Sequence, residues 1–211
     1  MSSFLDQFSK LDYPLMGLVR LPEVTISPEV RATYGVSKEI SNRDIFKWIV
    51  QQGYLDKRAA GKFVNQTEEE VVARLKFEFE VFAKTGIIDY LLSVWDLMDW
   101  CDRNSIPRGP GRGSVTGSLA CFCSGITKVN PLTHNLNFTR FISEARAKPK
   151  IIDGVIYAVG KSMCDIDCDI SFSQRDKVLA YLEQKYPGRT AKICNRLELT
   201  GKMALKDVLK T

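Results

Sequence analysis

The stretch Gly109-Pro110-Gly111-Arg112-Gly113-Ser114-Val115-Thr116-Gly117-Ser118 places four glycines within ten residues. Glycine lets the backbone approach a ligand closely and adopt dihedral angles that other residues avoid. We predict a helix from Ser114 to Cys123, whose first free N–H groups would point at an anion. Arg108 and Arg112 would add positive charge beside these groups. The stretch therefore predicts a phosphate cradle, in which Ser114 and the neighbouring backbone amides make the contacts.

Three carboxylates follow about fifty residues later, in Cys164-Asp165-Ile166-Asp167-Cys168-Asp169-Ile170. Apolar and acidic residues alternate with the two-residue period of a strand, so Asp165, Asp167 and Asp169 are expected on one face. Like charges this close repel unless a hard cation neutralises them, and oxygen ligands near phosphate suit Mg²⁺, with Mn²⁺ as an alternative. The pattern indicates nucleotidyl transfer, in which two metal ions clamp the attacking and leaving oxygens.

Each of the two patterns also has a simpler explanation. A Gly-rich loop on its own is often only a turn. Three alternating aspartates can form a solvated sheet edge or a structural calcium site. For each pattern taken alone, these alternatives stay open.

The remaining patterns alternate between helical and extended segments. Thr67-Glu68-Glu69-Glu70 is a capping box that opens an apolar-faced helix, and Asn42 is expected to cap the helix before it. Further expected elements are a strand at 90–94 that leads into a helix, a hairpin at 151–156 with an Asp-Gly turn, a helix after Ser173, a strand at 190–194 and a last helix capped by Thr200. These elements predict an α/β (α+β) fold, a small mixed sheet with packed helices.

Composition is that of an ordinary globular protein. The 211 residues are 45% hydrophobic and 26% charged, enough for a core of one domain or one and a half. No apolar stretch reaches the length of a bilayer span and the N-terminus starts no signal peptide, so we expect a cytoplasmic chain without a membrane partner. The six cysteines form no Cys-x-x-Cys pair and His134 stands alone, which favours reduced thiols over a zinc site.

Charge is distributed unevenly along the chain. Residues 1–100 carry a net charge of −3, whereas residues 101–211 carry +8. The basic half contains both the Gly-rich stretch and the three aspartates. A DNA or triphosphate partner would favour this distribution, although solvated surface lysines are its commoner meaning.

The run from Ile106 to Leu132 resembles the bacterial replicative polymerases of family C, the DNA polymerase III alpha subunits. That family has a Gly-Pro-Gly-Arg-Gly-Ser loop that leads into a helix, a Gly-Ile-Thr turn and an Asp-Pro-Leu. Here the turn is Gly125-Ile126-Thr127, and Asn130-Pro131-Leu132 stands for the last motif. The similarity continues in the segments 75–95, 137–142, 165–171 and 206–208, so that roughly Arg20 to Leu209 follows the family's order.

Some residues depart from the family pattern. Cys164 stands where the family has Pro, and Ile170 where it has Phe. Thr200-Gly201-Lys202-Met203 only approximates the family's Gly-Thr-Met-x-x-Lys, so a DNA contact there is weakly supported. An insertion at 145–163 carries the predicted hairpin. None of these departures removes a carboxylate.

The resemblance implies a nucleotidyltransferase palm like that of polymerase beta. Residues 1–104 would form its helical N-terminal region and residues 105–211 its nucleotide- and metal-binding core. Asp167 and Asp169 would be the catalytic metal ligands, with Asp165 as a supporting ligand. Arg112, Gly113 and Ser114 would bind the triphosphate of an incoming dNTP.

The family's thumb, fingers and third catalytic carboxylate would lie beyond this chain. The resemblance therefore implies a divided polymerase, encoded by a virus of bacteria and working in the host cytoplasm, whose second polypeptide supplies those parts. Its substrates would be dNTP and primer–template DNA. Two alternatives are a stand-alone nucleotidyltransferase, completed by Asp153, Asp176 or Glu198, and a non-catalytic binding module of a replication machine.

Overall fold

The computed structural model describes residues 18–20, 24–33, 35, 40–145, 147, 149–159, 163–191, 201, 205, 208 and 209. The chain divides into two compact units, residues 1–174 and residues 175–211. The division into a region 1–104 and a region 105–211 stays a prediction. Among the described residues, no helix combines the length and the apolar character that a membrane crossing requires.

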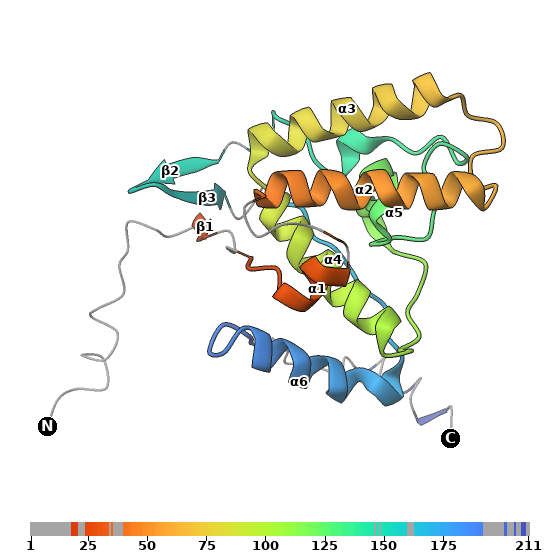
Figure 1. Cartoon of the computed structure of the whole chain (residues 1–211). Coiled ribbons are helices and arrows are strands. Elements are labelled where there is room, and N and C mark those ends of the chain that lie inside the picture. The colour runs from red at the N-terminus through yellow and green to blue at the C-terminus, as the bar shows by residue number, and fades with distance from the viewer. Residues whose placement is uncertain are drawn as a thin grey trace, which may run out of the picture. The chain divides into compact units, whose positions relative to one another are not determined.

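The first unit is built around four helices, which Figure 1 shows packed together. They are α2 (Asn42–Ala59), α3 (Glu68–Thr85), α4 (Ile88–Arg103) and the short α5 (Leu119–Ser124), and a further short helix, α1 (Pro28–Thr33), precedes them. Helix α5 is fully buried from Leu119 to Cys123, in contact with both α2 and α3. The segment that follows the Gly-rich stretch is therefore at the centre of this unit.

Aromatic rings join α2 to α3. The ring of Phe46 lies 5.7 Å from that of Phe79 and 6.3 Å from that of Phe82, and Phe82 in turn contacts Phe138 at 5.7 Å. Phe46, Phe82 and Phe138 are almost completely buried. Tilted and edge-on pairs of this kind add to the free energy of burying the rings. Through Phe138, the segment that follows α5 packs against this cluster.

Two of the predicted helix starts can be compared with the structure. The capping box of α3 is confirmed: Thr67 Oγ1 accepts from the Glu70 N–H at 3.2 Å, and Glu70 Oε2 accepts from the Thr67 N–H at 2.9 Å. The cap predicted for α2 was wrong by one residue, because Ser41 accepts from the Asp44 N–H. Asn42 instead donates its side-chain amide to the Val24 carbonyl and to Asp89 of α4. Asn42 therefore bonds to residues that are distant in the sequence and does not cap the helix.

The strand predicted at 90–94 was wrong, because these residues lie inside α4. Buried residues recur at Leu91, Leu92, Trp95 and Met98, which is the spacing of one helix face. A five-residue apolar run does not by itself distinguish a strand from a buried helical segment. The burial of this face against α2 decides for the helix.

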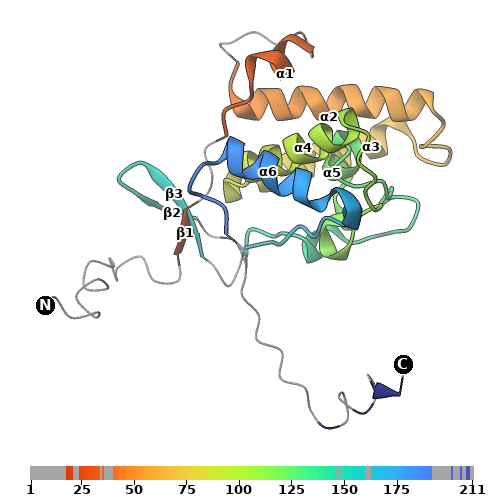
Figure 2. The same cartoon turned by 90° about the horizontal axis from the view of Figure 1, so that it is seen from below.

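The sheet of the first unit has three short antiparallel strands in the order β1-β3-β2. They are β1 (Leu18–Arg20), β2 (Lys150–Ile152) and β3 (Val155–Val159). Asp153 and Gly154 connect β2 to β3 with φ values of 50° and 77°, as a two-residue hairpin turn requires. Figures 1 and 2 show the hairpin projecting beyond the helices. The predicted hairpin and the α/β class are confirmed.

In the second unit, α6 (Arg175–Lys185) is the helix expected after Ser173. A 3-10 turn at Phe172–Gln174 ends the first unit just before it. The strand predicted at 190–194 and the last helix from Thr200 fall largely outside the described residues. The same holds for Lys202.

Candidate nucleotide and metal site

The Gly-rich loop and the aspartate segment run side by side, although some sixty residues separate them in the chain. The Gly109 N–H donates to the Asp169 carbonyl at 2.9 Å, and the Ser171 N–H donates to the Pro107 carbonyl at 3.0 Å. Between these bonds, residues 108 and 170 form an antiparallel bridge. A Cβ on Gly109 would lie 2.8 Å from the Cβ of Asp169, so only glycine permits this approach. The fold thus brings the two predicted halves of the site together.

The aspartate segment alternates as predicted. Asp165, Asp167 and Asp169 are exposed, whereas the residues between them are half-buried. The segment is extended, but the described part of it joins no ladder apart from the single bridge at Ile170. The prediction was therefore right about the exposed face and wrong about a regular strand.

The helix predicted from Ser114 to Cys123 was wrong at its start. Gly113–Gly117 form a 3-10 turn, closed by the Thr116 hydroxyl, which donates to the Gly113 carbonyl at 2.8 Å. Helix α5 begins afterwards, with Ser118 as its cap. Gly113 itself has a φ of 68°, which a helix cannot accommodate.

A buried carboxylate occupies the start of α5. Glu78 of α3 has no exposed surface and accepts from the amides of Leu119 and Ala120 at 2.9 and 3.0 Å. It also accepts from the Ser118 hydroxyl and from Arg74 Nε, both at 2.7 Å. Burial raises the pKa of Glu78, while these four donors oppose that shift. The first amides of α5, the helix that forms in place of the predicted one, are therefore already satisfied inside the protein.

Glu78 was not among the residues that the sequence predicted for the site. Its only signal was an acidic residue at the apolar face of an amphipathic helix, four residues after Arg74. Arg74 extends the same network, because its guanidinium also donates to the Gly117 carbonyl at 2.9 Å. The pair anchors the end of the Gly-rich loop to α3.

Four of the predicted site residues gather at the exposed end of the loop. Arg112 Nη1 lies 3.3 Å from Asp169 Oδ1, and both side chains are largely exposed. A Cβ built on Gly113 would lie 3.8 Å from Asp167 Oδ2, an ordinary contact distance. Ser114 follows in the 3-10 turn and is half-buried. The backbone of Gly113, one guanidinium and two carboxylates therefore face one patch of surface.

The three aspartates do not converge as a complete metal site. Within the described part of the chain, no three His, Cys, Asp or Glu side chains are grouped so that they could hold an ion. Asp167 and Asp169 are the pair nearest the Gly-rich loop. Mg²⁺ is commonly held by one or two carboxylates together with substrate phosphates and water. The donor set fits such an ion, completed by a phosphate ligand.

Arg108, which was expected to add positive charge beside the phosphate cradle, forms a salt bridge with Asp102. Its side chain is only 4% exposed and forms a two-pronged ion pair with Asp102. It also donates to the carbonyls of Gly125, at 2.8 Å, and of Ile126. The hydrogen bond from Arg108 lowers the pKa of Asp102 below its ordinary value. Arg108 holds the end of α5 against α4.

The cysteines form no disulfide in the described part of the chain. Cys101, Cys121, Cys123, Cys164 and Cys168 are all free thiols. Burial raises the pKa of Cys164 and that of Cys168 to about 11, so neither is a reactive thiolate at neutral pH. The expectation of reduced thiols without zinc stays a prediction, and Cys194 lies outside the described residues.

Several known proteins have sequences similar to that of this chain. The family described as bacterial DNA polymerase III alpha NTPase domain matches residues 49–211. The chain is 36% identical over 176 residues to the DNA polymerase III subunit alpha of Ureaplasma parvum serovar 3, which covers 83% of this chain and 16% of that protein. It is 32% identical over 213 aligned residues to the Chlamydia pneumoniae subunit (99% and 16%) and 37% identical over 142 residues to the Bacillus subtilis strain 168 subunit (67% and 12%).

The chain spans about a sixth, or less, of the length of these curated relatives. The family match covers well over half of the chain, and it includes the Gly-rich loop, the aspartate segment and the Glu78 network. On this basis the chain belongs to the bacterial DNA polymerase III alpha family.

Proposed function

We propose that this chain is the nucleotide- and metal-binding palm part of a DNA-directed DNA polymerase of family C. It would add dNMP to a primer 3′-hydroxyl, directed by a DNA template, in the cytoplasm of a bacterial host. The observation that carries the proposal is the pairing of the Gly-rich loop with the aspartate segment, which brings Asp167 beside Gly113 and Asp169 beside Gly109 and Arg112. Family membership supports the same assignment.

Each residue has a distinct part in the proposed reaction. The Gly113 amide and the Ser114 hydroxyl would bind phosphate oxygens of the incoming dNTP, and Arg112 would neutralise further charge on the triphosphate. Arg112 pairs with Asp169 in the structure, so triphosphate binding would exchange one anionic partner for another. Asp167 and Asp169 would hold Mg²⁺, which in such enzymes stabilises the charge on the attacking and leaving oxygens.

A two-metal site of this type requires more ligands than these residues supply. Two exposed carboxylates would bind Mg²⁺ weakly by themselves, because nothing fixes the remaining ligand positions. We propose that the third carboxylate, the thumb and the fingers come from a second polymerase polypeptide, in the replication system of a bacteriophage. Activity would then require both chains.

Primer extension by the reconstituted complex tests this proposal. The tagged chain is purified at mild salt from its native cells, its stoichiometric partner is identified by mass spectrometry, and extension is measured with Mg²⁺ and with Mn²⁺. Asp167→Asn with Asp169→Asn should reduce extension at least about a hundredfold, since charge stabilisation of the transition state is lost. Asp153→Asn, in the hairpin turn, is the matched control and should retain activity. A double variant that still extends primers in the complex would contradict the assignment.

The same experiment separates the two alternatives. Metal-dependent incorporation by the pure chain, with no partner, would favour a stand-alone nucleotidyltransferase. Partner binding without any extension, indifferent to both aspartates, would favour a non-catalytic replication module.

A further inference from the structure

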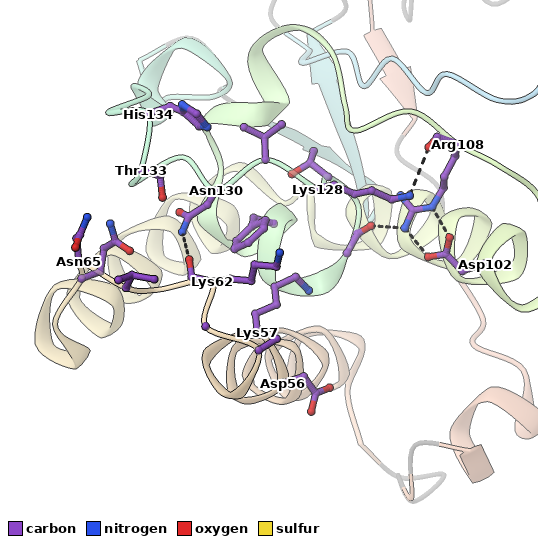
Figure 3. Close-up of a pocket in the computed structure, with 18 residues that line it drawn as sticks. Asp56, Lys57, Lys62, Asn65, Asp102, Arg108, Lys128, Asn130, Thr133 and His134 are labelled. Atoms are coloured by element: carbon purple, nitrogen blue, oxygen red, sulfur yellow. Dashed lines mark hydrogen bonds and ion pairs between the residues drawn. The ribbon is translucent and has the colours of Figure 1, made fainter.

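A second concave surface lies on the other side of the Gly-rich loop. It is a groove of about 960 Å³ between the end of α2, the loop that follows α2 and the segment that follows α5. Lys57, Lys62 and Lys128 line the groove from these three elements, and Figure 3 shows the Lys128 side chain directed toward the Arg108 carbonyl. None of the candidate catalytic residues lines this groove. It is therefore separate from the site described above.

The groove is positively charged. Four cationic side chains line it, those of Lys57, Lys62, Arg108 and Lys128, against the carboxylates of Asp56 and Asp102. Asp102 is neutralised by its ion pair with Arg108. Within the described part of the chain, neither Lys62 nor Lys128 forms an ion pair with a carboxylate, and both are exposed. The excess charge is available to an anionic ligand.

Polar groups inside the groove also lack protein partners. Thr127 is 1% exposed, and its hydroxyl has no hydrogen-bond partner among the described residues. The buried Oε1 of Gln66 likewise has no hydrogen-bond partner among the described residues. Lys57 Nζ uses one of its three N–H donors on the Cys123 carbonyl, at 2.9 Å. Buried polar groups are normally paired, so the Thr127 and Gln66 oxygens are exceptions in residues that line the groove.

The residues that line the groove favour the backbone of a nucleic-acid strand over a free nucleotide as its ligand. Phe122 is buried, and the Lys57 ammonium lies 5.4 Å from its ring centroid, so this ring offers no free face on which a base could stack. Lys57, Lys62 and Lys128 line the groove from three separate elements of the chain. They can therefore contact more than one phosphate, as the backbone of a strand provides.

The groove also connects directly to the Gly-rich loop. The Lys128 N–H donates to the Pro110 carbonyl at 2.7 Å, and its ammonium approaches the Arg108 carbonyl at 3.4 Å. We propose that this groove binds the sugar–phosphate backbone of a single nucleic-acid strand, through Lys57, Lys62 and Lys128. The inference rests on the proposed function, since it assigns a strand-binding surface to the same polymerase part.

Binding of a fluorescein-labelled oligothymidylate to the full 211-residue chain, measured by fluorescence anisotropy at several salt concentrations, tests the inference. Lys62→Glu with Lys128→Glu should weaken binding at least about tenfold and lower the salt dependence by about two released ions. The matched control is Lys47→Glu with Lys76→Glu, which makes the same charge change at exposed lysines of α2 and α3 outside the groove. It should weaken binding less than about threefold. Thermal unfolding of both double variants checks that they are folded.

The inference would be overturned if the wild-type chain did not bind the oligonucleotide, or if the two double variants lost the same amount of affinity. It would also be overturned if pyrophosphate, at an equal concentration of phosphate groups, displaced the oligonucleotide, because that would indicate a site for small anions. Asp167→Asn with Asp169→Asn, measured without metal, should leave the affinity unchanged. If that variant abolishes extension while the groove variant binds normally, the groove assignment fails and the proposed function stands. If the groove variant loses binding while the aspartate variant still extends primers, the proposed function fails and the groove stands.

Discussion

At the scale of single residues, Glu78 organises the surroundings of the candidate site. Its buried carboxylate joins α3 to the first amides of α5, and its neighbour Arg74 reaches the last carbonyl of the Gly-rich turn. A buried carboxylate is tolerated only when its lone pairs are used, and here four donors use them. The loop can then expose its other end, at Arg112 and Gly113, without losing its anchor.

Removing this carboxylate should therefore be costly. We expect Glu78→Ala to lower the free energy of unfolding by about 3–5 kcal/mol, because the amides of Leu119 and Ala120 would be left buried without an acceptor and Arg74 would lose its carboxylate partner. Chemical denaturation of the purified chain measures the change. Glu80→Gln, an exposed change on the same helix, is the control and should stay within about 0.5 kcal/mol of the wild type. Similar stabilities for the two variants would contradict the role given to Glu78.

The ion pair of Asp102 with Arg108 makes a second prediction at this scale. The pKa of Asp102 is lower in the folded than in the unfolded chain, so the pair stabilises the fold above about pH 4 and loses this effect as the pH falls further. The difference in unfolding midpoint between wild type and Asp102→Asn should shrink on acidification from pH 6 to pH 3. Asp153→Asn should show no such convergence. A difference that is independent of pH would argue against the ion pair.

At the scale of elements, the packing of α2 on α5 depends on Gly53. A Cβ at this position would lie 2.0 Å from the Cys123 carbonyl oxygen, well inside contact distance. Helix propensity alone would make alanine here favourable by roughly 0.5–1 kcal/mol. The clash is with backbone and cannot be relieved by rotating a side chain, so packing outweighs propensity.

Gly53→Ala should accordingly destabilise the protein by about 1–3 kcal/mol, opposite in sign to its effect on an isolated helix. Denaturant unfolding of the chain gives the sign directly. Gln51→Ala, two residues earlier and exposed, should have little effect. A more stable Gly53→Ala protein would mean that α2 and α5 are not in close contact.

Elements were predictable where their signal was local. The capping box at Thr67 and the Asp153-Gly154 hairpin turn each depend on residues a few positions apart in the sequence, and both are present as expected. The segment at 90–94 could not be assigned in this way, because a short apolar run fits a strand or a buried helix equally well. Its packing partners, which lie far away in the chain, decide between the two.

In the candidate site, too, features with a local sequence signal were predictable and features that depend on distant residues were not. The exposed alternation of Asp165, Asp167 and Asp169 and the proximity of Gly113 agree with the prediction. The role of Arg108 could not be predicted, because nothing in its local pattern distinguishes a free surface arginine from a buried partner of Asp102. Pairing of this kind depends on which distant groups burial brings together.

At the scale of the whole molecule, the described thiols report on how well the core is packed. Burial raises the pKa of Cys121 and Cys123, and both residues lie inside α5. Iodoacetamide at pH 8 should therefore modify Cys168, which is partly exposed, before either of them. Peptide mass spectrometry over time measures the order of labelling. Rapid labelling of Cys121 in the native chain would show that α5 is not buried, whereas denaturant should make all the thiols reactive.

The order of residues was sufficient to indicate the family, the α/β class and the residues around Gly113 and Asp167, since motifs and alternation are properties of neighbouring residues. It was not sufficient to show that α5 begins at Ser118 or that its amides are bound by Glu78, some forty residues earlier in the chain. An amide satisfied by a buried carboxylate and an amide open to phosphate have the same local sequence. Which of the two forms depends on desolvation and on the partners that the packed core brings within hydrogen-bonding distance.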